Sequence, residues 1–134
     1  MGCPHWDQYI DIVAKSPIEG VENVMYTLHF YAATHKDYLR DKLEAAVKSG
    51  LPVFVSECAG MEASGNGPLA PDEYQKWLDV MEKNKVSWVN WSVSDKDETC
   101  SMLLPRAKAT GNWTDDLIKP WGKMVKQALK KYNR

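Results

Sequence analysis

The sequence has no long apolar segment and no excess of charge of either sign. Its apolar runs stop well short of the ~20 residues that a membrane-spanning helix needs, and its amino terminus lacks the pattern of a signal peptide. Lysine and arginine total 17 residues against 18 aspartates and glutamates, for a net charge of −1. Because nucleic acids and anionic membranes are bound through clustered basic side chains, we expect neither as a partner, and the charge balance suits a neutral ligand.

Cysteine is scarce, and its spacing has no pattern. Cys3, Cys58 and Cys100 are odd in number and widely separated, without a C-x-x-C pair or a histidine at zinc spacing. This argues against a disulfide scaffold and the common zinc motifs. We therefore expect the three thiols to be small buried apolar groups, and we predict no metal and no other cofactor. His5 and His35 belong to no motif, and we expect both to be ordinary surface or loop residues.

The chain of 134 residues is long enough for one core. We treat residues 1–134 as a single domain. Three β-rich segments, at Asn23–Tyr31, Pro52–Glu57 and Ser87–Ser92, alternate with segments of helical period. That alternation is typical of βα units, in which parallel strands are covered by outer helices. The sequence therefore predicts an α/β fold.

Three helices are predicted between and after these strands. Apolar residues recur at helical spacing over Asp37–Ser49, which a glycine follows, and over Asp72–Asn84, which follows a proline. Trp77 lies on the apolar stripe of the second helix, so we expect it in the core. The last helical segment starts near Thr114, but Pro120 interrupts it, which predicts a short turn followed by the main helix.

Polar and aromatic residues stand at the carboxyl end of each predicted strand: His29 and Tyr31, then Glu57, then Asn90 and Trp91. The carboxyl ends of parallel strands meet at one edge, so these side chains should form one rim, where barrel enzymes place their chemistry. The spacing of His29 and Tyr31 puts both on one face of their strand. Taken singly, each residue has a plainer explanation, because Glu57 could open a solvated loop while His29 and Trp91 could be core residues.

Together these blocks resemble a known enzyme family. The stretches Met25–Ala32, Val53–Glu57 and Ser87–Ser92, with the loop Ala63–Gly67 and the tail Gly111–Thr114, are similar to the last strands of glycoside hydrolase family 5 endo-β-1,4-glucanases. The likeness runs over nearly the whole chain. It implies the carboxyl-terminal half of a (β/α)8 TIM barrel, from about strand five to strand eight, and retaining hydrolysis of β-1,4-glucan or cello-oligosaccharide.

The resemblance also implies roles for individual residues. Glu57 matches the family's nucleophile at the end of the seventh strand, and His29 and Tyr31 match the pair beside it on the sixth, with Tyr31 hydrogen-bonded to Glu57. The positions that match substrate contacts, or that lie in the matching blocks around them, are Trp91 under the cleaved sugar, Trp6 as a stacking platform, Lys96 and Glu98 at the neighbouring sugar, Asn90 and Ala63. Without the resemblance, Lys96 is equally a solvated loop lysine.

One half of the catalytic pair is not found in the sequence. A retaining glycosidase needs a second carboxylate, the acid/base, ~5–5.5 Å from the nucleophile. In the family it follows an asparagine at the end of the fourth strand, and no such Asn-Glu pair ends a predicted strand here. A (β/α)8 barrel also needs roughly 250 residues. Because Met1–Trp6 is similar to the tail of the fifth strand, we expect a carboxyl-terminal piece that is inactive alone.

A partial barrel leaves sheet edges unpaired, and such edges pair readily with another chain. We therefore expect a homo-oligomer or a complementary amino-terminal half as partner, and a parent enzyme that is secreted or periplasmic. Two alternatives stay open. The chain could be a non-catalytic, self-associating half-barrel that binds glycans weakly, or a remnant without enzymatic function.

Overall fold

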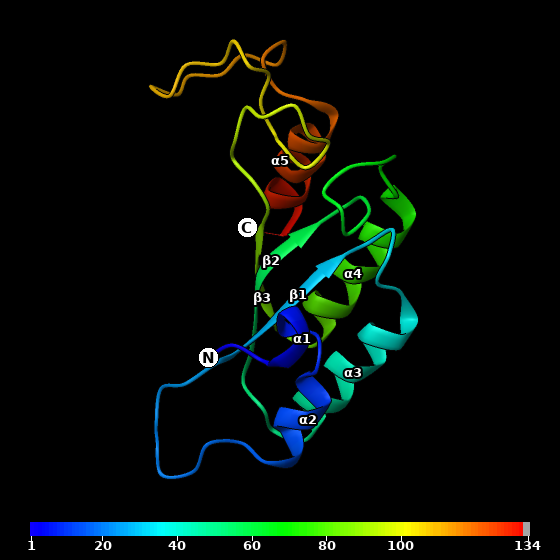
Figure 1. Ribbon diagram of the computed structural model, residues 1–134, viewed down its shortest axis with the longest axis vertical. Coiled ribbons are helices and arrows are strands. Elements are labelled where there is room, and N and C mark those ends of the chain that lie inside the picture. The colour runs from blue at the N-terminus through cyan, green and yellow to red at the C-terminus, as the bar shows by residue number, and fades with distance from the viewer. Residues whose placement is uncertain (133–134) are drawn as a thin grey trace.

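The computed structural model describes residues 1–132, which form one parallel sheet with helices packed against it (Figure 1). The strands are β1 (Tyr26–Tyr31), β2 (Val53–Ala59) and β3 (Ser87–Asn90), in the order β1-β2-β3. The helices are α1 (Pro4–Asp7), α2 (Ile10–Lys15), α3 (Asp37–Lys48), α4 (Pro71–Lys83) and α5 (Pro120–Tyr132). The predicted α/β class is confirmed, and both strand pairs are parallel.

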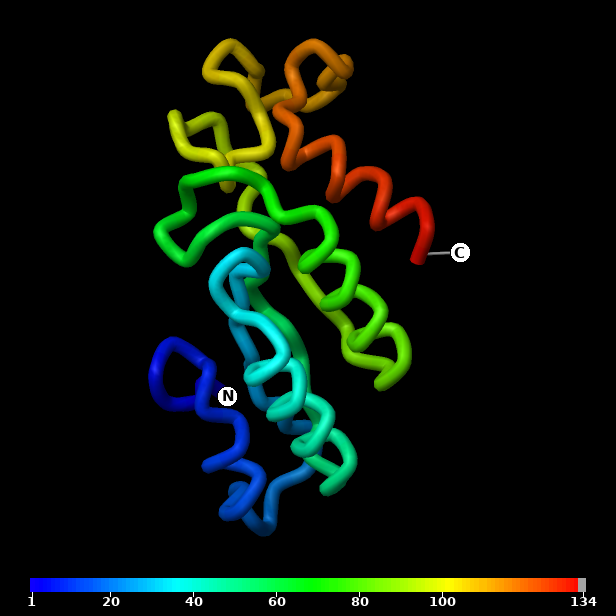
Figure 2. The backbone as a smooth tube through the Cα atoms, turned by 90° about the vertical axis from the view of Figure 1, so that its right-hand side faces the viewer, coloured from blue at the N-terminus to red at the C-terminus, as the bar shows by residue number. Residues whose placement is uncertain are grey.

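The alternation of side chains along β1 separates two environments. Tyr26, Leu28 and Phe30 are buried, whereas the residues between them are only partly covered. Buried residues of the sheet meet α3 and α4, which run side by side along it (Figures 1 and 2). The ring of Phe30 stacks on that of Trp77 in α4, with centroids 3.9 Å apart. Trp77 is fully buried, which confirms its predicted place in the core.

The helices begin and end close to the predicted residues. Gly50, just after α3, has a φ of 89°, a left-handed conformation that glycine adopts without a steric penalty. α4 begins at a proline, which is well suited to the first turn because the missing N–H has no partner there anyway. The last segment forms a short turn before α5 starts at Pro120, as predicted. α1 and α2, both very short, were not predicted.

The amino-terminal segment pairs with the edge of the sheet beside β1 through one residue, Met1. The amino group of Met1 donates to the carbonyl of Met25 at 2.8 Å, and the amide of Thr27 donates to the carbonyl of Met1 at 2.9 Å. This is the hydrogen-bond pattern of a parallel strand. The chain then leaves the edge at α1. On the other side, no strand within residues 1–132 pairs with the outer edge of β3.

The three cysteines were expected to be buried, and two of them are. Cys58 and Cys100 are buried as expected, but Cys3 is partly exposed because it lies in the amino-terminal segment, outside the sheet. Across the part of the chain that the structure describes, no helix has both the length and the apolar character to cross a membrane.

Candidate active site

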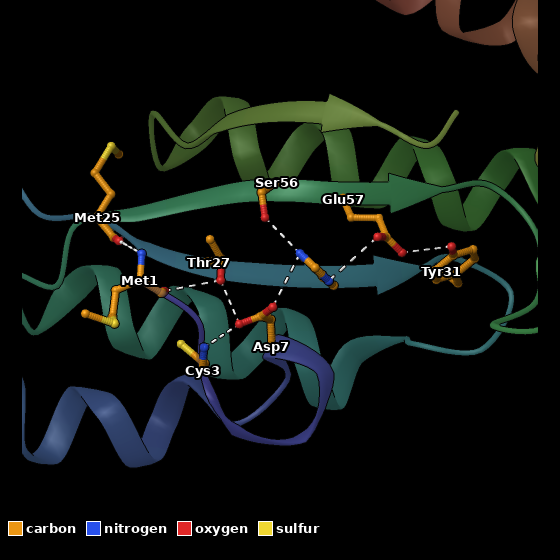
Figure 3. Close-up of polar contacts among 9 residues, drawn as sticks. Met1, Cys3, Asp7, Met25, Thr27, Tyr31, Ser56 and Glu57 are labelled. Carbon is orange, nitrogen blue, oxygen red and sulfur yellow. Dashed lines mark hydrogen bonds and ion pairs between the residues drawn. The ribbon is translucent and has the colours of Figure 1, made fainter. Parts of the chain in front are cut away.

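Three of the predicted site residues, His29, Tyr31 and Glu57, meet near the carboxyl end of β1 and β2. Figure 3 labels Tyr31 and Glu57. The hydroxyl of Tyr31 donates a hydrogen bond to Glu57 Oε1 at 2.9 Å. His29 pairs with Glu57 in the register of the two strands, and its Nδ1 lies 4.0 Å from Glu57 Oε2. The contact between Tyr31 and Glu57 therefore has the geometry that the resemblance implied.

A bulge in β2 creates this arrangement. The register passes from Leu28 opposite Val55 to His29 opposite Glu57, so Ser56 is an extra residue. In a regular strand, Ser56 and Glu57 would point to opposite faces; a bulge sets both against one residue of the partner strand. The hydroxyl of Ser56 accordingly lies 2.8 Å from His29 Nε2. Period-two alternation cannot reveal such a bulge, so Ser56 was not among the predicted site residues.

The side chain of Glu57 lines a cavity of about 590 Å³. Its walls come from α1, the ends of β1 and β2, and the loops after them, and the lining residues are His5, Trp6, Asp7, Gln8, His29, Tyr31, His35, Glu57 and Ala63. Trp6 is 77% exposed and presents a free aromatic surface. The cavity thus combines a carboxylate, hydrogen-bonding groups and an aromatic ring, which is the combination that sugar rings require.

The environment of Tyr31 keeps its hydroxyl protonated. Burial, reinforced by the hydrogen bond to Glu57 and by that residue's charge, raises the pKa of Tyr31 well above its usual range. The phenol is therefore a donor throughout the neutral range, and Glu57 Oε1 is its acceptor. Glu57 Oε2 is left for other contacts.

His35 lies in the loop between β1 and α3, as one of the two expected alternatives had it, but it is not a surface residue. His35 is 5% exposed, and its Nδ1 accepts the backbone N–H of Tyr31 at 2.8 Å. Its carbonyl accepts the indole N–H of Trp77 at 2.7 Å. The turn after β1 folds the side chain back under the strand end, and burial lowers the pKa of His35. A neutral ring suits an acceptor role, so His35 fixes the backbone of Tyr31. His5 is exposed, as expected.

Asp7 also lines the cavity, although no motif or spacing in the sequence predicted it. Its Oδ1 accepts the hydroxyl of Thr27 at 2.6 Å and the backbone N–H of Cys3. Its Oδ2 lies 3.4 Å from His29 Nε2. These contacts depend on a turn in which His5, Trp6 and Asp7 all have positive φ. Residues other than glycine rarely adopt a positive φ, so the residue types in this turn do not predict its conformation.

The residues predicted from the third strand do not join this cavity. Asn90 Oδ1 accepts the hydroxyl of Tyr74 in α4 at 2.8 Å and lies 3.3 Å from the thiol of Cys58, so the amide faces the helix layer. Trp91 is 45% exposed, and its carbonyl accepts the indole N–H of Trp121 at 2.7 Å. Neither residue lines the cavity around Glu57.

Lys96 and Glu98 lie in the loop beyond β3, away from Glu57. Glu98 lines a second cavity of about 400 Å³ with residues of the 66–69 loop and the start of α5. The ammonium group of Lys119 donates to the carbonyls of Lys96 and Glu98, at 2.7 and 3.1 Å, and so ties this loop down. The side chain of Lys96 is exposed. Within residues 1–132, no three side chains of the metal-binding types lie close enough to hold an ion.

Parallel strands that carry a carboxylate and a tyrosine at their carboxyl ends are arranged as in α/β barrel enzymes, whose active sites lie at that rim. A family profile described as cellulase (glycosyl hydrolase family 5) matches residues 1–97. The chain belongs to this family.

Named relatives agree with this membership. The chain is 42% identical to an endoglucanase of Clostridium saccharobutylicum, over 96% of its own length and 29% of the relative's. It is 41% identical to endoglucanase 5 of Pectobacterium carotovorum, over 97% of its length and 26% of the relative's. The chain therefore spans between a quarter and a third of these enzymes.

Solved structures show the same fold. The catalytic domain of Thermobifida fusca endoglucanase Cel5A, in complex with cellotetraose, superimposes with a TM-score of 0.82 at 29% identity. The alignment covers 90% of this chain and 39% of that one. A structure from Cytophaga hutchinsonii gives a TM-score of 0.94 at 39% identity, over 99% of this chain and 44% of that one. The three-stranded sheet and its helices are thus part of a family 5 barrel.

Proposed function

We propose that this chain is the carboxyl-terminal part of a retaining endo-β-1,4-glucanase and that Glu57 is its nucleophile. The observation that supports this most strongly is the hydrogen bond from Tyr31 to Glu57 at the mouth of an open cavity. The bond uses Oε1 and orients the carboxylate, so Oε2 is the oxygen that meets the substrate. The similarity to named endoglucanases supports a β-1,4-glucan as substrate.

In the proposed reaction, Glu57 Oε2 attacks the anomeric carbon of the bound sugar. The bond from that carbon to the leaving oxygen breaks, an acid protonates that oxygen, and a covalent glycosyl-enzyme forms. Water then attacks the same carbon and releases Glu57, with the acid now acting as base. Trp6 stacks on a sugar ring within the cavity.

The acid/base is proposed to lie on the remaining part of the barrel. Asp7 is the other carboxylate in the cavity, but its oxygens face Thr27, Cys3 and His29, so it is poorly placed to protonate a leaving group. Loss of general acid catalysis lowers a rate by roughly 10²–10⁴-fold. We therefore expect negligible hydrolysis of unactivated glucan by this chain alone.

The open sheet supports association with a complementary amino-terminal half. β3 has no neighbour on its outer edge within residues 1–132. Val89, Trp91 and Val93, at that edge and just beyond it, are exposed. In a closed barrel the preceding strands would cover such an edge. A homo-oligomer that pairs these edges, and binds glycans without turnover, is the second candidate.

Complementation tests the proposal. A polypeptide carrying the first strands of the Clostridium saccharobutylicum endoglucanase is mixed with this chain, and reducing ends released from carboxymethyl cellulose are measured. We expect activity only in the mixture, and a loss of roughly 10⁴-fold or more with Glu57→Gln, as for other covalent nucleophiles. Glu62→Gln, in the exposed loop after β2, is the matched control. Equal activity of the two variants would overturn the assignment of Glu57.

A further inference from the structure

The imidazole of His29 lies between the carboxylates of Asp7 and Glu57, both labelled in Figure 3. Its Nε2 is 3.4 Å from Asp7 Oδ2, and its Nδ1 is 4.0 Å from Glu57 Oε2. A neutral imidazole carries one proton, on one nitrogen or the other, while an ionised carboxylate only accepts hydrogen bonds. Asp7 and Glu57 therefore compete for a single N–H group, and the outcome determines whether Nδ1, the nitrogen that faces Glu57, is a donor or an acceptor.

Ser56 does not decide this competition. Its hydroxyl lies 2.8 Å from His29 Nε2. A hydroxyl can accept a hydrogen bond from an N–H or donate one to a bare ring nitrogen. Ser56 therefore fits either tautomer, and the choice depends on the two carboxylates.

The contacts of Asp7 favour a proton on Nε2, the ring nitrogen of His29 that faces Asp7. Asp7 Oδ1 is occupied by the hydroxyl of Thr27 and the backbone N–H of Cys3, which fixes the carboxylate plane and leaves Oδ2 toward His29. On the other side, 4.0 Å is too long for a hydrogen bond to Glu57. Asp7 also sits in a turn of left-handed residues, a conformation that persists only where the surroundings hold it.

We infer that Asp7 is a positioning residue that holds His29 as the Nε2–H tautomer, with the bare Nδ1 toward Glu57. His29 then gives Glu57 no hydrogen bond, and Oε2 keeps its lone pairs for the sugar. This consequence for reactivity rests on the proposed role of Glu57. The assignment of the tautomer does not depend on that role. A measurement that contradicts the tautomer would therefore leave the proposed role of Glu57 intact.

The test is nitrogen NMR of the whole chain labelled with ¹⁵N-histidine, at a pH above the measured titration of His29. We expect a pyrrole-like shift for Nε2 and a pyridine-like shift for Nδ1. In Asp7→Asn, Thr27 and Cys3 still donate to Oδ1, so the NH₂ group replaces Oδ2 and presents a donor to Nε2. The proton should move to Nδ1, and the two shifts should exchange.

Two variants serve as controls. Asp11→Asn removes a carboxylate from the same amino-terminal segment, one that pairs with Lys42 at 2.9 Å, and should leave the His29 shifts unchanged. Glu57→Gln removes the competing carboxylate and should retain the Nε2–H pattern. The inference is overturned if the unsubstituted chain shows the Nδ1–H pattern, a result independent of how any variant folds. It is also overturned if folded Asp7→Asn keeps Nε2–H.

Discussion

The two sides of the short sheet differ in what their side chains contact. On the helix side, Leu28, Phe30 and Asn90 lie in a packed layer, where Asn90 Oδ1 accepts the hydroxyl of Tyr74 in α4 and the thiol of Cys58. On the cavity side, His29, Tyr31 and Glu57 line an open cavity, and their side chains contact one another, Ser56 and Asp7. Neighbouring residues of one strand thus serve stability or chemistry according to the face they occupy. Substitutions should separate the two sides.

The largest expected effect is on the helix side. Trp77→Ala removes the ring that stacks on Phe30 and the indole donor to His35, and leaves a large cavity. We expect a loss of about 3–5 kcal/mol in the free energy of unfolding, measured by urea denaturation. Trp6→Ala, on the exposed turn, should change it by less than about 0.5 kcal/mol. Similar losses for both would remove the distinction between the two sides.

A medium effect is expected for Asn90, which the sequence assigned to the rim. Asn90→Ala leaves the buried hydroxyl of Tyr74 without its acceptor, at a cost of about 1–3 kcal/mol in stability. Affinity for cellotetraose, titrated by NMR, should not change, because the amide faces α4. A weakened affinity with unchanged stability would place Asn90 on the cavity side after all.

A smaller effect is expected for glycan binding. A cleft with one wall should bind cellotetraose only weakly, with a Kd near 1 mM, or about −4 kcal/mol. Loss of one stacked ring removes about 0.5–1.5 kcal/mol, so Trp6→Ala should weaken binding severalfold. Trp91→Ala is the comparison, since Trp91 lies outside the cavity. If Trp91→Ala alone abolishes the shifts, the sugar site lies along β3.

The smallest effect concerns pH. Burial lowers the pKa of His35 below its unfolded value of about 6.5. The unfolded chain then binds more protons between the two values, so the stability that the neutral ring supplies is complete above pH ~6.5 and is lost as pH falls toward the folded pKa. His35→Asn, whose Oδ1 can still accept from Tyr31, should flatten this part of the stability profile. His5→Asn should change the profile less, because the charge of His5 is only the secondary cause of the lowered pKa of His35, after burial. Parallel profiles for His35→Asn and the unsubstituted chain would refute the role.

The sequence was sufficient for the features that repeat along the chain. Periodicity placed α3, α4 and Trp77, and strand ends placed His29, Tyr31 and Glu57 at one edge. Features that depend on local breaks in that regularity could not be predicted from the sequence. The bulge at Ser56, the left-handed turn that carries Asp7 and the fold-back of His35 each arise from tertiary contacts that no spacing encodes.

Chemical trapping gives the most direct test of Glu57. A 2-fluoro cellobioside with an activated leaving group needs no acid for the first step, and fluorine slows the release of the glycosyl-enzyme. The chain, alone and complemented, is incubated with this probe and analysed by mass spectrometry. We expect one fluorocellobiosyl group per chain, mapped to Glu57, absent from Glu57→Gln and retained in Glu62→Gln. Labelling of another carboxylate, or a complemented chain that hydrolyses glucan with Glu57 unlabelled, would contradict the proposed nucleophile.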